Sequence, residues 1–142
     1  KLSLGFRTNI SSSDEDYYAL VVYNGILGGG IHSKLFQNVR EKESMAYYAF
    51  SRLEKFKGLM VISSGILNEF DSTLKTIETG MKSLMDSQLQ IVDFYLSQSI
   101  VNTNDDFNSF IEKIKKVTKD DVIRVANKIK LDTIYFLTGT EA

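Results

Sequence analysis

The pattern of hydrophobic and polar positions predicts a strand and then a helix at the start of the chain. Apolar and polar or small residues alternate over residues 2–7, which is typical of a half-buried strand. Apolar residues then fall on more than one helical face between residues 17 and 27, so this helix should be well buried. Ser13 and Asp16 stand three positions apart just before it, as in a capping box.

Three consecutive glycines, Gly28, Gly29 and Gly30, should end this helix, because glycine accepts left-handed backbone at little steric cost. A second helix is predicted from about Ser33 to Glu43. Its buried stripe would consist of Leu35, Phe36 and Val39.

The middle of the chain predicts a β-hairpin followed by helices. Residues 47–56 and 59–62 have strand patterns, and Lys57-Gly58 would form the turn between them. Helical spacing of apolar residues follows from about residue 68 to 84 and again over residues 89–101.

The start of the last helix carries a clear signal. Thr118 and Asp121 are placed as a capping box, and Val117 and Val122 as the hydrophobic staple around it. Residues 133–138 then predict a closing strand.

The order of elements, with a hairpin and grouped helices, predicts an α+β fold: a two-layer sandwich with a mostly antiparallel sheet and helices packed on one face. The 142 residues are enough for a single domain, 1–142, with one buried core.

Composition narrows the function classes. The chain has no cysteine, which excludes disulfides and thiolate metal sites, and its net charge of −1 gives no general attraction to nucleic acid or anionic membranes. No apolar run approaches the roughly 20 residues that span a bilayer, and no signal peptide is visible. We therefore expect a cytoplasmic protein.

The glycine turn has three interpretations. A phosphate loop would need a preceding strand and a Lys-Ser or Lys-Thr at fixed spacing, and neither is present. A helix stop is the simpler structural explanation. The third interpretation is a turn at the rim of a cleft, where backbone N–H groups meet an extended peptide.

No hydrolytic centre is evident in the sequence itself. His32 is the only histidine, and no His-x-x-Glu-His motif accompanies it, so we expect a solvent-facing residue and no bound metal. There is no Gly-x-Ser-x-Gly element for a serine nucleophile. Glu41 and Glu43 are two residues apart and do not share a helix face, which indicates a solvated helix end.

Arg40 and Tyr47 are the remaining candidates, seven residues apart on either side of a helix-to-strand junction. A guanidinium can donate to a carbonyl or carboxylate in fixed geometry, and a phenol can donate to an oxyanion. The structural alternative is an exposed arginine and a tyrosine packed on the sheet.

The sequence around this pair resembles the M16 family of insulinase, pitrilysin and mitochondrial processing peptidase. The segments that carry the resemblance are Asn24–Gly30, Ser33–Phe36, Val39–Lys42 and Ala46–Tyr47, supported near the end by Val117–Val122, Val125–Ala126 and Thr138–Gly139.

The resemblance implies repeated α+β halves around a chamber, one of which holds zinc through an inverted His-x-x-Glu-His motif. The other half lacks the motif and supplies an arginine and a tyrosine to the substrate. By this resemblance Tyr47 would stabilise the scissile carbonyl, Arg40 would orient the peptide, and Gly28, Gly29 and Gly30 would form a candidate substrate-contacting turn. Zinc would be held by a partner domain or subunit.

Two departures from the family pattern matter. The zinc motif is absent, so this chain alone should be inactive, and the region between residues 68 and 90 is shorter than in family members. We therefore expect one C-terminal-type domain from a longer protein, acting on a peptide substrate together with a zinc-bearing domain. The alternative is a catalytically inactive scaffold or partner-binding module.

Overall fold

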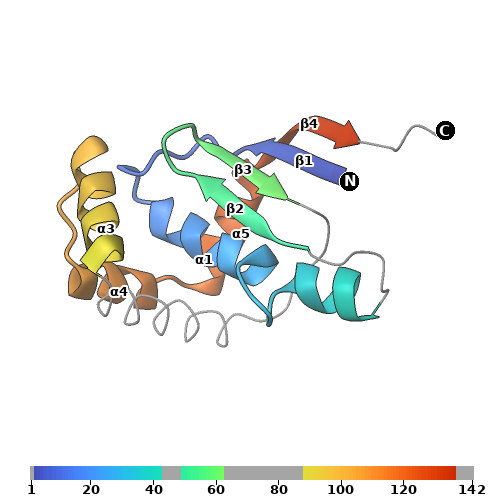
Figure 1. Cartoon of the computed structure of the whole chain (residues 1–142), viewed down its shortest axis with the longest axis horizontal. Coiled ribbons are helices and arrows are strands. Elements are labelled where there is room, and N and C mark those ends of the chain that lie inside the picture. Colours follow the sequence, from blue (N-terminus) through green and yellow to red (C-terminus); the bar gives the residue numbers. More distant parts are fainter. Residues whose placement is uncertain (1, 43–48, 63–87, 137–142) are drawn as a thin grey trace.

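The chain folds into one antiparallel sheet with helices packed against one of its faces (Figure 1). The computed structural model describes residues 2–42, 49–62 and 88–136. This arrangement confirms the predicted α+β two-layer sandwich. The predicted helix over residues 68–84 lies outside the described residues.

The sheet has four described strands in the order β2-β3-β1-β4, and every neighbouring pair is antiparallel. The strands are β1 (Leu2–Arg7), β2 (Ser51–Glu54), β3 (Leu59–Ile62) and β4 (Lys130–Phe136). Gly58 lies in the turn between β2 and β3 with a φ of +59°, a left-handed conformation that favours glycine. The predicted hairpin is confirmed, although β2 is shorter than the predicted range 47–56.

Five helical segments accompany the sheet in the part of the chain that the structure describes. They are α1 (Tyr17–Gly28), the π-helix η1 (Phe36–Lys42), α3 (Gln88–Ile100), α4 (Phe107–Lys115) and α5 (Lys119–Lys128). None of the helices in the described ranges is both long and apolar enough to cross a membrane.

Helix α1 forms the centre of the hydrophobic core. Val22 of α1, Ile114 of α4 and Val125 of α5 are almost completely buried in one cluster. A second cluster joins the end of α1 to the sheet through Leu35 and Met60. Each such side chain stabilises the fold by about 1.5–3 kcal/mol when fully buried. The predicted burial of α1 on more than one face is confirmed.

Helix α4 was not predicted from the sequence, although its signals are present. Phe107, Phe110, Ile111 and Ile114 are spaced for one helical face, and all four are buried. Asp106 caps the helix by accepting a hydrogen bond from the backbone N–H of Ser109 at 2.8 Å.

The capping box of α5 is confirmed. The Thr118 hydroxyl accepts from the Asp121 N–H, and the Asp121 carboxylate accepts from the Thr118 N–H at 2.9 Å. Val117 and Val122 are both buried, as the hydrophobic staple requires.

The predicted capping box of α1 is wrong. Asp16 is the N-cap residue, but its side chain makes no capping hydrogen bond. Its carboxylate instead accepts from Arg124 at 2.7 Å and from Lys128 at 2.6 Å, both on α5. The Asp16 carboxylate therefore forms ion pairs with a distant helix and does not cap the first turn of α1.

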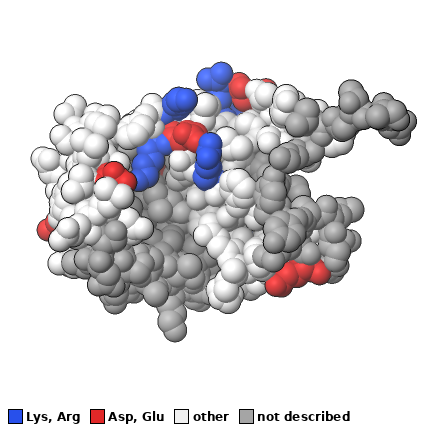
Figure 2. Space-filling model, in the orientation of Figure 1, with Lys and Arg blue, Asp and Glu red and all other residues white. Residues whose placement is uncertain are grey.

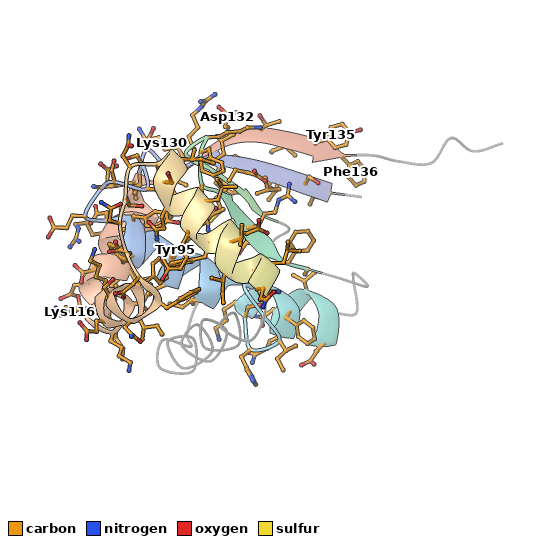
Figure 3. The ribbon with its side chains drawn as sticks, turned by 60° about the vertical axis from the view of Figure 1, so that its left-hand side comes forward. Tyr95, Lys116, Lys130, Asp132, Tyr135 and Phe136 are labelled. Atoms are coloured by element: carbon orange, nitrogen blue, oxygen red, sulfur yellow. The ribbon has the colours of Figure 1, made fainter. Side chains whose placement is uncertain are left out.

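Strand β4 lies at one edge of the described sheet, and all seven of its residues are exposed. Figure 3 shows Tyr135 and Phe136 at its far end, beyond the helices. An irregularity between Gly5 and Phe6 shifts the register with β4, and Arg7 then pairs with Asp132 at 2.6 Å.

Replacing Asp121 with asparagine should make the fold less sensitive to acid. Hydrogen bonds from Thr118 and then Arg124 lower the pKa of Asp121 to about 2 from its ordinary 3.8. Because this pKa is lower in the folded state, the carboxylate stabilises the fold above about pH 4, and this contribution is lost as the pH falls toward 2. The free energy of unfolding, measured with urea at about pH 5 and pH 2.5, should fall less for Asp121→Asn than for the unmodified chain.

Asp120→Asn is the matched control, because Asp120 lies in the same first turn of α5 outside the capping box. An equal reduction of acid sensitivity in both variants would show that the capping carboxylate is not responsible.

Candidate functional site

The candidate site begins where α1 runs into the glycine turn. Gly28 is the last residue of α1 and is buried. A Cβ atom placed on it would lie 2.1 Å from the backbone nitrogen of Ser51 and 2.7 Å from Leu35 Cδ1. The end of α1 can therefore approach the start of β2 only because residue 28 has no side chain.

Helix α1 ends at the glycine turn as predicted, but the predicted left-handed backbone conformation is wrong. Gly29 is the C-cap residue of α1 with a φ of −80°, which is ordinary right-handed backbone. Its N–H donates to the carbonyl of Gly25 at 3.3 Å, and the chain then turns through a bond from the Ser33 N–H to the Gly30 carbonyl at 3.0 Å. Close packing, not backbone freedom, explains the glycine at position 28.

Beyond the turn, the predicted α-helix over residues 33–43 is largely a π-helix. Helical backbone starts at Lys34, and η1 follows. The side-chain amide of Asn38 donates to the Lys34 carbonyl at 3.0 Å. In an α-helix this carbonyl would accept the backbone N–H of Asn38, so the side chain competes for it and favours the wider turn. Segments of π-helix are rare and frequently occur at functional sites.

Arg40 lies in η1, seven residues before Tyr47. The side chain of Arg40 and all of residues 43–48 lie outside the described residues, so the relative position of the pair stays a prediction. The backbone of Arg40 belongs to η1, the helix that follows the packed glycine turn.

Asn24 provides an independent signal at this end of α1. Its carbonyl accepts a hydrogen bond from the Ser51 hydroxyl at 3.1 Å. Its side-chain oxygen Oδ1 is buried and has no hydrogen-bond partner among the residues that the structure describes. Buried polar atoms without a partner are uncommon, and each calls for an explanation. Sequence reasoning did not single out Asn24 for this property.

The described ranges contain no cluster of three or more His, Asp or Glu residues that could hold a metal ion. His32 is exposed in the turn before η1. The described residues therefore do not fit a zinc site.

A second polar cluster, also missed from the sequence, joins α1 to α4. The Tyr18 hydroxyl donates to Asp105, and Lys113 Nζ donates to both Asp105 and the Tyr18 oxygen, the latter at 3.0 Å. Desolvation and the bond to Asp105 raise the pKa of Tyr18, while the Asp105 carboxylate raises the pKa of Lys113. The charges of this cluster compensate each other, which is typical of a structural contact.

The fold and the glycine turn are those of an M16-type domain. Its described residues include no cluster of metal ligands. Residues 1–99 match the family described as "Peptidase M16 inactive domain". The chain therefore belongs to the M16 peptidase family, as an inactive-type domain.

Similar proteins agree with this assignment. The chain is 39% identical over 166 residues to "Probable inactive metalloprotease YmfF" of Bacillus subtilis (strain 168), covering 99% of this chain and 39% of the relative. It is 30% identical to "Uncharacterized zinc protease YmxG" of the same organism, covering 94% of this chain and 36% of that protein.

A solved structure has the same fold. A conserved protein from Enterococcus faecalis V583 superposes with a TM-score of 0.85 at 30% identity, covering 98% of this chain and 39% of that one. The chain thus spans about two fifths of the length of these relatives. The alignment with YmfF covers 166 positions although this chain has 142, so that relative contains residues that this chain lacks.

Gly28→Ala should destabilise the fold by at least about 2 kcal/mol, because the new methyl group would overlap the backbone of Ser51 and force α1 away from β2. Thermal and urea unfolding would measure the loss. Gly5→Ala is the matched control, since its Cβ would meet Thr133 Cβ at an ordinary 3.6 Å. Equal stability of the two variants would refute the packing role of Gly28.

Proposed function

We propose that this chain is a non-catalytic, substrate-binding domain of an M16-type zinc peptidase, working with a zinc-bearing domain or subunit. The observation that carries the proposal is the Arg40–Tyr47 spacing within a chain of the M16 inactive-domain family. Two features support a site at this place: the π-helix that carries Arg40, and the buried Asn24 oxygen in α1, which has no hydrogen-bond partner among the described residues.

The two side chains would divide the work according to their chemistry. The Tyr47 phenol is a neutral donor that can stabilise the negative charge developing on a carbonyl oxygen. The Arg40 guanidinium can hold a peptide carbonyl or carboxylate in fixed geometry before and during the reaction. The water that attacks the peptide bond would be activated by zinc on the partner.

Gly28, Gly29 and Gly30 would bring the substrate close to this pair. The buried Gly28 has a packing role in any case, and the Gly29 N–H already donates to Gly25. If the turn contacts the substrate, Gly29 and Gly30 would make most of that contact, because they are less buried than Gly28.

The test of the proposal is peptide hydrolysis by the full-length protein together with its zinc-bearing domain or subunit, with and without a zinc chelator. We expect chelator-sensitive cleavage by the assembly and none by this chain alone. Cleavage by the isolated chain, or tight stoichiometric zinc binding to it, would contradict the proposal.

The second candidate function is a scaffold that no longer supports cleavage. It is favoured by the 39% identical relative, whose name describes a probable inactive metalloprotease. An assembly that binds its partner domain but cleaves no peptide, with or without added zinc, would support this alternative.

Tyr47→Phe in the complete assembly should lower kcat by about 100-fold and change KM little, because the lost hydroxyl acts mainly in the transition state. Steady-state kinetics on a fluorogenic peptide would measure both constants. Tyr48→Phe removes the neighbouring hydroxyl and should leave turnover unchanged. If both variants keep full turnover, Tyr47 has no part in the mechanism.

Arg40→Ala should raise KM by about tenfold with a smaller effect on kcat, because the guanidinium binds the substrate in the ground state as well. The control is Lys42→Ala, which removes one nearby positive charge from the same helix. A KM that rises equally in both variants would indicate a general charge effect and would argue against a specific contact by Arg40.

A further inference from the structure

A separate hollow lies at the opposite end of β2 from the glycine turn. It is bounded by the β2–β3 turn, the loop after β1 and the end of α3, and it has a volume of about 540 Å³. We call it the basic hollow because its charged lining residues are Arg7, Lys55, Lys57 and Asp14. It contains none of the residues assigned to the peptidase function, so an inference from it goes beyond that function.

The positive charge of the basic hollow is only partly compensated. Arg7 pairs with Asp132 at 2.6 Å. Asp14, the single acidic lining residue, accepts a hydrogen bond from the Ser11 N–H at 2.6 Å. Lys55 and Lys57 have no ion-pair partner among the residues that the structure describes. In Figure 2, Lys and Arg side chains gather near the top of the visible face with Asp and Glu side chains among them, and the whole chain has a net charge of −1.

A smaller hollow of about 100 Å³ adjoins the first and shares Ser12, Lys55, Phe56 and Val101 with it. We call it the aromatic recess, because α1, α3 and α4 line it with aromatic rings. These rings are Tyr17, Tyr18, Phe94 and Phe110.

The walls of the aromatic recess are held in place by their own packing. Phe94 of α3 stacks on Phe107 with ring centroids 4.3 Å apart and meets Phe110 edge-to-face at 5.9 Å. Tyr18 meets Phe110 edge-to-face at 5.6 Å. The recess is therefore preformed, and its volume suits one apolar side chain rather than a larger ligand.

Two large apolar side chains at the rim remain in contact with water. Phe56, between the two lysines, is 59% exposed, and Ile100 at the end of α3 is 58% exposed. Phe56 and Ile100 line the basic hollow together with the two lysines, so apolar and positively charged surface lie side by side there.

We propose that the basic hollow and the aromatic recess together bind an acidic peptide segment of a partner protein. One apolar side chain of the segment would enter the recess, and flanking carboxylates would face Lys55 and Lys57. Charge complementarity selects an acidic occupant. The small positive area and the overall net charge argue against a nucleic acid, which needs a longer basic surface.

The test uses fluorescence anisotropy with a fluorescein-labelled peptide that has one phenylalanine between two pairs of glutamates. We expect saturable binding that weakens as ionic strength rises. Replacing the glutamates by glutamines, or the phenylalanine by serine, should each lower the affinity by about tenfold, since each removes one half of the recognition.

Protein variants then locate the site. Lys55→Glu/Lys57→Glu should weaken binding of the acidic peptide by at least about tenfold, because attraction becomes repulsion. Lys34→Glu/Lys116→Glu changes the net charge equally but lies outside both hollows and should bind like the unmodified chain. Phe56→Ser should weaken binding without changing the salt dependence.

Three results would overturn the proposal. They are no saturable binding of the acidic peptide, equal loss of affinity in the two double variants, and stronger binding of a single-stranded oligonucleotide of the same charge. Because Lys55, Phe56 and Lys57 are exposed, the variants should unfold at the temperature of the unmodified chain, which circular dichroism would verify.

Discussion

The close contact between Gly28 and Ser51 is the constraint on which the rest of the structure depends. It brings the last turn of α1 against the first residue of β2, and the Ser51 hydroxyl donates to the Asn24 carbonyl in the same contact. Leu35 packs against the same point after the turn. One residue without a side chain therefore sets how closely the end of α1 can approach β2.

Burial of apolar side chains supplies most of the stability around this contact. Ion pairs between α1 and α5 orient these two helices relative to each other. Val22, Ile114 and Val125 are completely or almost completely removed from water, which contributes about 1.5–3 kcal/mol for each. The pairs of Asp16 with Arg124 and Lys128 involve half-exposed cations, and such pairs are usually worth at most about 1 kcal/mol. Their contribution is to fix how α5 lies along α1.

The sequence predicted the elements whose signals are local. The alternation in β1, the Thr118–Asp121 capping box and the hairpin turn at Gly58 are each decided by neighbouring residues, and the structure contains all three. Predictions failed where a distant group competes. Asp16 binds α5 and does not cap α1, which residue spacing in the sequence cannot show.

In the candidate site, too, features with local signals were predicted, and features that depend on distant residues were not. The glycine turn and a helical segment carrying Arg40 were predicted, but the reason for the glycine was not, because it depends on Ser51, which is 23 residues away from Gly28. The π-helix depends on the side chain of Asn38 taking a backbone acceptor. The basic hollow joins β1, the hairpin turn and α3, and only the tertiary structure brings these three together.

The pairing of β1 with β4 has a consequence for how such a unit is combined with others. The first and last described strands are antiparallel neighbours, so Leu2 and Phe136 face each other at the same end of the sheet (Figure 1). These two positions, far apart in the sequence, therefore lie in one small region of the sheet. Segments joined to β1 and β4 at these two positions leave the order of the strands unchanged. Such a unit can therefore be inserted into a longer polypeptide, duplicated or exchanged with its fold intact.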